Sequence, residues 1–276
     1  METRYSVDDV RYQHMTTDEL RSSFLVDRLF QQEEITLLYS NADRAIIGSA
    51  APVERKLTLS SAKELAAEYF TQRREIGVIN VGGRGKIIVD GKEFGMENRD
   101  GLYIGRGSRV IEFETAAHQS PALFYFLSYP AHCDYPTVHA KKADAEAVHL
   151  GSKNEANERT LHKYIHPGGI QSCQLVMGLT ELAQGSVWNT MPAHTHERRT
   201  EVYFYFDIPD ASVVFHLMGK PSETRHIVVR NRQAVISPSW SIHAGAGTSS
   251  YTFIWGMGGE NQDFGDVQRV DTENLK

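Results

Sequence analysis

Two histidines separated by one threonine, with a glutamate a few residues later, are the residues of this chain best suited to chemistry. His194 and His196 stand in MPAHTHERRTEVYFYF (191–206), which also contains Glu201. Side chains two apart on a strand project from the same face, and a turn through ERRT can bring Glu201 back toward the pair. His243 lies far along the chain, after Pro238. Three imidazoles and one carboxylate are a common ligand set for a divalent transition metal, so we predict a metal site here rather than four ordinary core or surface residues.

The segments that must position these residues have the pattern of a β protein. Short apolar runs such as QLVMGLTEL, SVVFHLMG, HIVVRN and YTFIWGMG alternate with Gly, Asp, Asn and Pro, which favours a sandwich or barrel. GKIIVDGKEF (85–94) predicts a hairpin with Asp90-Gly91 in a type I′ turn. Thr16 with Glu19, and Ser61 with Glu64, are typical of capping boxes, so a short helix is expected after each.

The two halves of the chain show an internal similarity. RREIGVINVGG (73–83) resembles RRTEVYFYFDIP (198–209), GLYIGRGSRVIEF (101–113) resembles AVISPSWSIHAGA (234–246), and ALFYFLSYP (122–130) resembles YTFIWGMGG (251–259). The offsets are about 126, 133 and 129 residues, which indicates a duplicated unit. We therefore predict a mainly β fold with two β-barrel or jelly-roll halves, at 1–150 and 151–276, and a polar connection over 139–160 without strands.

Bulk composition excludes several classes of protein. The chain has 276 residues, 41% of them hydrophobic, and a formal net charge of −6, which argues against a nucleic-acid or anionic-membrane partner. Cys133 and Cys173 do not form a CxxC pair, and a disulfide scaffold would have more cysteines. No apolar run reaches the ~18 residues of a membrane span, and METRYSVDDV shows no signal peptide, so a cytoplasmic protein is expected.

His-x-His-x4-Glu with a distant histidine resembles the metal motif of cupins, and the doubled strand pattern resembles a bicupin. Longer segments are similar to the 5-keto-4-deoxyuronate isomerase family over essentially the whole chain; they are FLVDRLF, YSNADRAIIG, RREIGVINVGGRGKIIVDG, NTMPAHTHERRTEVYFYF, MGKPSETRHIVVRNRQAVISPSWSIHAGAGT and YTFIWGMGGENQDF. The resemblance implies one zinc ion on His194, His196, Glu201 and His243, a hexamer, and an aldose–ketose isomerisation. Its substrate would be 5-dehydro-4-deoxy-D-glucuronate and its product 3-deoxy-D-glycero-2,5-hexodiulosonate, in the breakdown of pectin and related polyuronides.

The repeat offsets assign this chemistry to the second half. They place Glu68, Phe70, Glu75 and Val110 at the positions of the four ligands. That set does not suit a metal ion, so we expect the first half to be structural or to help build an assembly.

The proton-transferring residue is left open by the sequence. Tyr203 and Tyr205 share the strand face of Glu201 and would point into the cup, where each can transfer a proton, orient substrate or simply pack in the wall. His226 in ETRHIVV can be a general base or a hydrogen-bonded core histidine, and a metal-bound hydroxide is a further candidate. An enediol and a hydride shift are equally compatible with the sequence.

A carboxylate substrate requires a cation. Arg198, Arg199, Arg225 and Lys163 are the candidates, and a bidentate arginine fits best. Trp240, three residues before His243, is expected in the pocket wall.

Two other functions use the same ligand pattern. An iron- or manganese-dependent dioxygenase or decarboxylase is the first, and the metal content of the purified protein distinguishes it. A non-catalytic sugar-binding cupin is the second, and it predicts a bound uronate without turnover.

Overall fold

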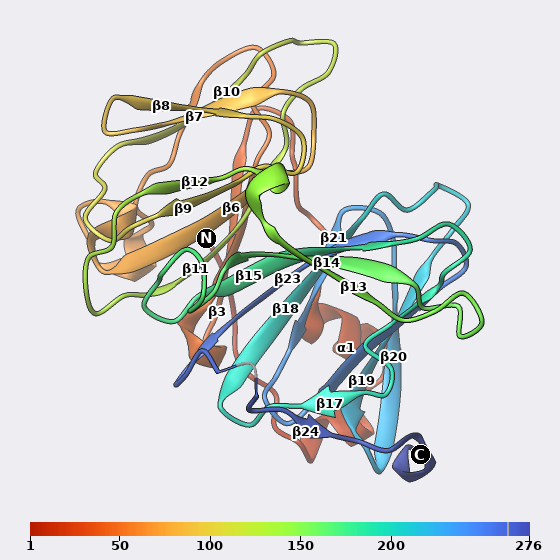
Figure 1. The fold of residues 1–276 in the computed structure, drawn as a ribbon. Coiled ribbons are helices and arrows are strands. Elements are labelled where there is room, and N and C mark those ends of the chain that lie inside the picture. Colours follow the sequence, from red (N-terminus) through yellow and green to blue (C-terminus); the bar gives the residue numbers. More distant parts are fainter. Residues whose placement is uncertain (264) are drawn as a thin grey trace. The chain divides into compact units, whose positions relative to one another are not determined.

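The computed structural model describes residues 1–263 and 265–276, and the chain is built mainly of β-strands (Figure 1), which confirms the predicted fold class. It divides into two compact units. The first contains Met1–Arg4, Arg28–Ala145 and Tyr164–Met177, and the second contains Tyr5–Asp27, Glu146–Lys163 and Gly178–Lys276. The units thus interleave along the chain, whereas the sequence predicted one division after residue 150.

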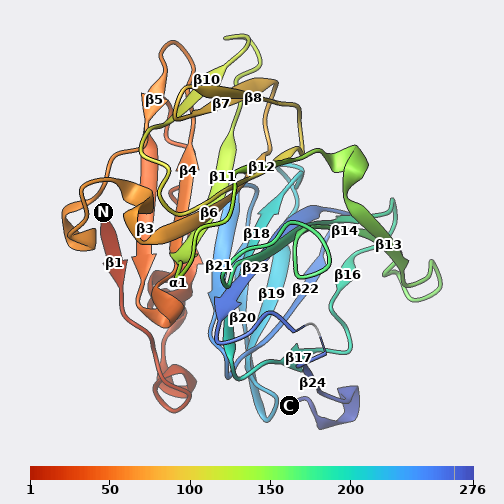
Figure 2. The same ribbon diagram turned by 60° about the vertical axis from the view of Figure 1, so that its left-hand side comes forward.

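The first unit has a seven-stranded and a four-stranded sheet (Figure 2). The larger sheet has the order β1 (Glu2–Arg4), β3 (Ile35–Ser40), β4 (Ile46–Ala50), β11 (Phe124–Pro130), β6 (Arg74–Asn80), β9 (Gly101–Ile104) and β12 (Val138–Ala140). The smaller has the order β5 (Leu57–Thr58), β10 (Ile111–Thr115), β7 (Gly85–Val89) and β8 (Lys92–Met96). The predicted hairpin is confirmed by β7 and β8, between which Asp90 and Gly91 have φ of 49° and 83°.

The second unit repeats this design. Its larger sheet has the order β13 (Glu146–Leu150), β14 (Arg159–Ile165), β15 (Val176–Leu182), β23 (Thr252–Gly259), β18 (Arg199–Phe206), β21 (Gln233–Ser237) and β2 (Leu25–Val26). The smaller has the order β16 (Trp188–Asn189), β22 (Ile242–Gly247), β19 (Val214–Lys220) and β20 (Glu223–Val229). A two-stranded sheet adds β17 (His194–Thr195) and β24 (Gln268–Arg269). The order β4-β11-β6-β9 matches β15-β23-β18-β21, which supports the interpretation of the repeat as a duplication.

Strand pairing corrects the alignment of the repeat by one residue. Glu201 pairs with Met257 and Ser237, and the counterparts of those two residues in the first unit, Ser128 and Ile104, pair with Ile76. Glu75 is therefore not the counterpart of Glu201, because a shift of one residue moves a side chain to the opposite face of the sheet.

The same correction applies to Val110, the predicted counterpart of His243. Val110 is 45% exposed, whereas Ile111 is buried in the core of the first unit together with Ile76 and Phe70. Glu68 is exposed, and its backbone N–H donates to the side chain of Gln72. The interior of the first unit is thus a packed apolar core.

One of the two predicted helices forms. Thr16 caps α1 (Thr17–Phe24) in a complete capping box with Glu19, which confirms the first prediction. The second is wrong, since Ala66 adopts a left-handed conformation that ends η3 (Lys63–Leu65) after one turn, and η4 (Phe70–Gln72) follows separately. The other short helical turns are η1 (Arg11–His14), η2 (Ala42–Arg44), η5 (Lys142–Asp144) and η6 (Thr272–Asn274).

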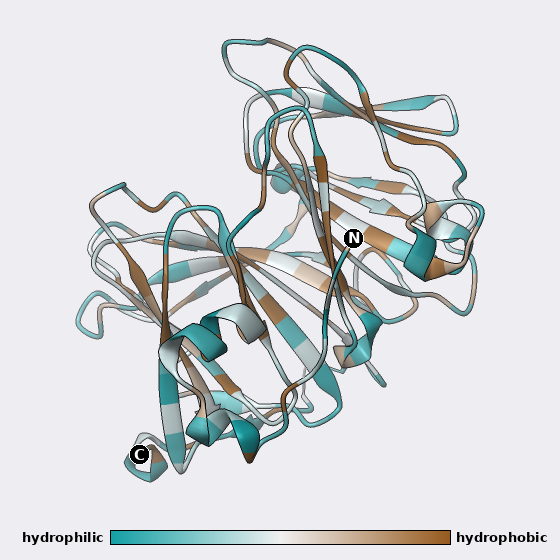
Figure 3. Ribbon diagram, turned by 180° about the vertical axis from the view of Figure 1, so that it is seen from behind, coloured by the Kyte–Doolittle hydropathy of each residue, from teal (hydrophilic) through white to brown (hydrophobic). Residues whose placement is uncertain are grey.

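The connection predicted over 139–160 also contains regular structure. It includes β13, whose residues are largely exposed and pair with β14. Exposure on the strand explains why its sequence is polar. Apolar residues elsewhere concentrate in the strands, while most connections are hydrophilic (Figure 3). Within residues 1–263 and 265–276, we find no helix of the length and apolar character required to cross a bilayer.

Candidate metal centre

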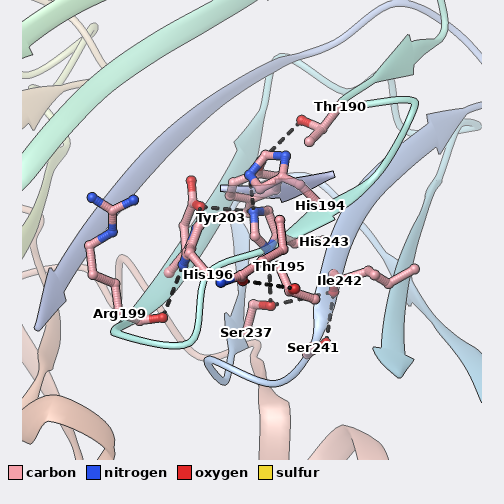
Figure 4. A network of polar contacts seen from close by, with 12 residues as sticks. Thr190, His194, Thr195, His196, Arg199, Tyr203, Ser237, Ser241, Ile242 and His243 are labelled. Atoms are coloured by element: carbon pink, nitrogen blue, oxygen red, sulfur yellow. Dashed lines mark hydrogen bonds and ion pairs between the residues drawn. The ribbon is translucent and has the colours of Figure 1, made fainter. Parts of the chain in front are cut away.

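The four predicted ligands come from separate parts of the second unit and converge on one point. His194 lies on β17, His196 follows it in the turn before β18, Glu201 lies on β18 and His243 on β22. Figure 4 shows the three imidazole rings side by side. One ligand atom from each of the four residues lies within 4.8 Å of the others. The structure therefore brings together the complete set that the sequence singled out.

The closest contacts join one carboxylate oxygen and the Nε2 atoms. Glu201 Oε2 is 2.9 Å from His196 Nε2 and 3.0 Å from His243 Nε2. His243 Nε2 is in turn 3.0 Å from His194 Nε2. His196, Glu201 and His243 are buried, and His194 is half-buried at the edge of the group.

Neighbouring groups orient two of the rings. His196 Nδ1 lies 3.1 Å from the carbonyl oxygen of Arg199, to which it donates its hydrogen, leaving the Nε2 lone pair directed at the centre. His243 Nδ1 lies 3.5 Å from the hydroxyl of Ser237. A partner on the outer ring nitrogen is the usual arrangement for a metal-binding histidine, because it sets the tautomer and the ring orientation.

The charges of the site also suit a cation. Burial lowers the pKa of His194 to about 3, with a further contribution from His243, so this ring is neutral at physiological pH. Burial by itself raises the pKa of Glu201, but His243 and His196 outweigh it and hold that pKa well below its usual value. Burial likewise opposes the charged form of His196, whose pKa is nevertheless raised by the adjacent carboxylate. An ionised carboxylate facing imidazole nitrogens fits a divalent transition metal such as zinc, iron or manganese.

The centre opens into a cavity of about 450 Å³, whose wall includes His194, His196 and Glu201. This volume lies within the ~300–1,000 Å³ of pockets that hold small molecules. A molecule in the cavity can therefore reach the point on which the ligands converge.

The three predicted catalytic residues have different locations. Tyr203 lines the cavity and its hydroxyl lies 3.1 Å from that of Thr190. Tyr205 is not part of the cavity wall, and its hydroxyl is hydrogen-bonded to Nδ1 of His216 across 2.7 Å. Burial raises the pKa of both phenols well above the usual value. His226 is exposed on β20, packs edge-on against Phe215 and is not in the cavity wall, a location that does not favour the predicted role as a base.

Only one of the predicted cations faces the cavity. Arg199 is buried in its wall, where its Nη1 donates to the side chain of Asn261 and to the carbonyl of Asp263. Arg198 is exposed and pairs with Glu260 instead.

The remaining predicted substrate residues have structural contacts away from the cavity wall. Arg225 donates to the carbonyl oxygens of Tyr12, Gln13 and Met15, which holds the N-terminal segment on β20. Lys163 pairs with Glu146 across β13 and β14. Trp240 packs against Tyr12 and Phe24, at ring-centroid distances of 4.7 and 6.3 Å. Trp240 lies only three residues before His243 in sequence, but its ring packs away from the cavity wall.

Sequence reasoning missed two arginines that do line the cavity. Arg159 comes from β14, and its Nη1 donates to the carbonyl of Asn157. Burial lowers its pKa, as expected for a guanidinium in a partly dry wall. Arg269, on β24, is exposed and lies opposite His194 in the strand register. Both lie on strands far from the ligand motif in sequence, and no local signal marks them.

A second polar group lies deep in the same unit and was also missed. His216 is completely buried, and burial lowers its pKa to about 3. Asn189 donates to the hydroxyl of Tyr251 across 2.6 Å. A methyl group on Gly245 would approach the Asn189 amide to 2.7 Å and the Tyr251 hydroxyl to 2.8 Å, so only glycine leaves room for this group.

The chain is similar to proteins of known name over its whole length. A model of the KduI/IolB family matches residues 24–274. A protein of Lachnoclostridium phytofermentans named 4-deoxy-L-threo-5-hexosulose-uronate ketol-isomerase is 55% identical over 276 residues, with 100% of both chains covered. The protein of the same name from Caldicellulosiruptor bescii is 52% identical over 276 residues, again with 100% of both chains covered.

Solved structures of low sequence identity share the fold. The crystal structure of an IolB-like protein from Salmonella typhimurium LT2 has a TM-score of 0.65 at 14% identity, covering 82% of this chain and 87% of that one. An oxalate decarboxylase structure has a TM-score of 0.59 at 8% identity, covering 88% and 77%. These likenesses confirm a cupin-like β fold.

The family match and the identity to full-length relatives show that the chain belongs to the KduI/IolB family.

Proposed function

We propose that this chain is a zinc-dependent ketol-isomerase that converts 5-dehydro-4-deoxy-D-glucuronate to 3-deoxy-D-glycero-2,5-hexodiulosonate. One observation carries the proposal: the His194, His196, Glu201 and His243 centre opens into a cavity whose wall also contains arginines. A cation-lined cavity beside a metal centre is suited to a sugar acid. The names of the relatives that are 52% and 55% identical support the same substrate and reaction class.

The reaction moves a carbonyl group from C1 to C2 of the sugar acid. A proton leaves C2 and one is added at C1, while the hydroxyl hydrogen of O2 is lost and O1 gains one, so atoms and electrons balance. Negative charge develops on the oxygen atoms during the transfer. The site must therefore bind both oxygens, stabilise that charge and provide a group that moves protons.

The four ligands would hold the zinc ion, which supplies a Lewis acid that stabilises the developing charge without redox chemistry of its own. Glu201 is ionised and faces two histidines, which suits a ligand better than a mobile base. Tyr203 keeps its proton at neutral pH, because burial raises its pKa. Its hydroxyl can donate a hydrogen bond to a substrate oxygen while Thr190, 3.1 Å away, orients it.

The substrate carboxylate binds at the arginines of the cavity wall. Arg199 already donates from Nη1 to Asn261 and Asp263, which orient its guanidinium. Arg159 donates from Nη1 to the carbonyl of Asn157 and presents its guanidinium to the cavity from the β14 side. A planar guanidinium matches a carboxylate in two parallel hydrogen bonds, so we assign Arg159 as the principal receptor.

The biological setting extends the proposal. The substrate would come from the breakdown of pectin or a related polyuronide, in the cytoplasm, and the active form would be a hexamer. Size-exclusion chromatography with light scattering measures the assembly, and a monomeric active enzyme would contradict that part alone.

A direct assay tests the function. The purified protein, loaded with zinc, is given the monomer released by exhaustive lyase digestion of polygalacturonate, and the sugar is followed by NMR. Loss of the C1 aldehyde signal and appearance of a second ketone are expected. An unchanged spectrum would rule out the isomerase, and a bound but unchanged uronate would indicate a binding protein. Iron instead of zinc in protein purified without added metal would contradict zinc as the cofactor and favour oxidative chemistry.

A further inference from the structure

The first unit contains a second group of side chains of the types that bind metal ions, formed by His132, Cys133 and Cys173. The two sulfur atoms are 3.5 Å apart, and both cysteines are free thiols. One ligand atom from each of the three residues lies within 4.8 Å of the others. The cysteines are half-buried and His132 is exposed, so an ion from solvent can reach them.

We propose that His132, Cys133 and Cys173 form a second metal site, for a tetrahedral thiophilic cation such as Zn²⁺. Two thiolates at Zn–S distances of ~2.3 Å and a tetrahedral angle place their sulfurs about 3.8 Å apart. The observed 3.5 Å is close to that separation and far from the ~2.0 Å of a disulfide. The imidazole supplies a third ligand, and the exposed side of the cluster leaves the fourth position to water.

Glu75 holds the Cys173 side of the cluster in place. Its carboxylate is fully buried and accepts backbone N–H hydrogen bonds from Cys173 at 2.7 Å and from Gln174 and Leu175 at 2.9 Å. The hydroxyl of Tyr103 donates a fourth, at 2.8 Å. A buried carboxylate with four donors makes a rigid anchor, so the backbone that carries Cys173 is ordered before any ion binds.

The segment that carries Cys133 is held against the same region. Gln174 Nε2 donates to the carbonyl of Pro130 at 2.6 Å. Arg106 donates to the carbonyl of Ala131 at 3.2 Å and to the carboxylate of Asp134 at 2.6 Å. Both cysteines are therefore presented from constrained backbone, which reduces the entropy that binding an ion would cost.

Hydrogen bonds to sulfur complete the arrangement. The backbone N–H of Cys133 donates to Sγ of Cys173 at 3.4 Å, and the Cys173 thiol donates to the carbonyl of Cys133 at 3.3 Å. Burial raises the pKa of the Cys173 thiol to about 11.

Such a site would act as a clip within the first unit. It would join the segment after β11 to the segment before β15, which are 40 residues apart at the two cysteines. The inference is independent of the proposed isomerase, because none of these residues lines the catalytic cavity.

Cobalt substitution tests the proposal on the full chain. Only a site with thiolate ligands gives a strong sulfur-to-cobalt charge-transfer band in the near ultraviolet. The group of His194, His196, Glu201 and His243 contains no cysteine, so cobalt bound there does not give this band. Freshly reduced protein, with both thiols counted by a thiol reagent, is titrated with Co²⁺ without oxygen. We expect the band to saturate when one ion is bound at the thiolates, in addition to the ion taken up by the His194 centre, and Zn²⁺ to abolish it. Absence of the band in protein with two free thiols would overturn the proposal.

Variants assign the ligands. Cys133→Ser and Cys173→Ser should each lose most of the band, and His132→Ala should weaken Co²⁺ binding by about tenfold or more. His226→Ala, which removes another exposed histidine, serves as the matched control and should bind normally. Because His132 is exposed, its variant tests the site without disturbing the core. A band of unchanged strength in both cysteine variants would overturn the assignment.

Discussion

The Tyr205 hydroxyl is hydrogen-bonded to Nδ1 of His216 across 2.7 Å, with both side chains buried inside the second unit. The two residues lie on β18 and β19, one in the seven-stranded and one in the four-stranded sheet of this unit. The hydrogen bond therefore links the strand that carries Glu201 to the opposite sheet. His216 Nε2 has no hydrogen-bond partner among the described residues, so Tyr205 is the main polar partner of this ring.

Tyr205→Phe is expected to destabilise the protein while leaving the metal site filled. Losing the hydroxyl leaves the buried His216 ring without its hydrogen bond, which costs about 1–3 kcal/mol. The midpoint of urea unfolding should fall, and the metal content should stay at the wild-type level. Unchanged stability, or a loss of metal, would contradict the structural role assigned to this pair.

Glu201→Gln is expected to weaken metal binding severely. The substitution keeps the volume of the side chain but removes the charge that faces His196 and His243 at 2.9 and 3.0 Å. Even the loss of an outer partner of a metal ligand costs about 10–100-fold in affinity, so a larger effect is expected here. Competition with a coloured chelator measures it. Glu260→Gln, which alters an exposed ion pair with Arg198, is the control and should bind metal normally.

Arg159→Gln should raise KM for the uronate by about 10–100-fold, the equivalent of one charge-assisted hydrogen-bonded contact at ~1.5–3 kcal/mol. The guanidinium lines the cavity, whereas that of Arg198 is exposed and paired outside it. Initial rates over a range of substrate concentrations separate KM from kcat. Arg198→Gln is the matched control. If both variants kept the wild-type KM, the carboxylate receptor would have to be sought at Arg199 or Arg269.

Glu75→Gln is expected to destabilise the first unit. An amide can accept some of the backbone N–H groups that the carboxylate holds, but its NH₂ group faces the others, so a cost of about 2–3 kcal/mol or more is expected. The thermal midpoint should fall, and affinity at the two cysteines should fall with it. Glu93→Gln changes an exposed carboxylate paired with Lys86 and should have little effect. A wild-type midpoint for Glu75→Gln would contradict the anchoring role.

The fold class and most of the candidate metal centre were predictable from sequence for local reasons. His194, His196 and Glu201 lie within one short segment, where strand geometry and one turn suffice to bring them together. The Asp90-Gly91 turn and the Thr16 capping box were equally readable, because each depends on residues a few positions apart. The capping-box pattern at Ser61 did not predict the structure correctly. Ala66 adopts a left-handed backbone conformation, so the chain forms only a short helical turn there.

What tertiary structure decided is which distant side chains share a space. The sequence alone determined a candidate metal ligand set, a doubled β pattern and a phenol-bearing strand beside those residues. Strand pairing then made Ile76, rather than Glu75, the counterpart of Glu201 in the first unit. A shift of one residue reverses the face of the sheet on which a side chain lies. Arg159 reaches the cavity, and Cys133 reaches Cys173, only through pairings between strands and loops far apart in the chain. Such contacts depend on the packing of whole sheets, and no local pattern of residue types specifies them.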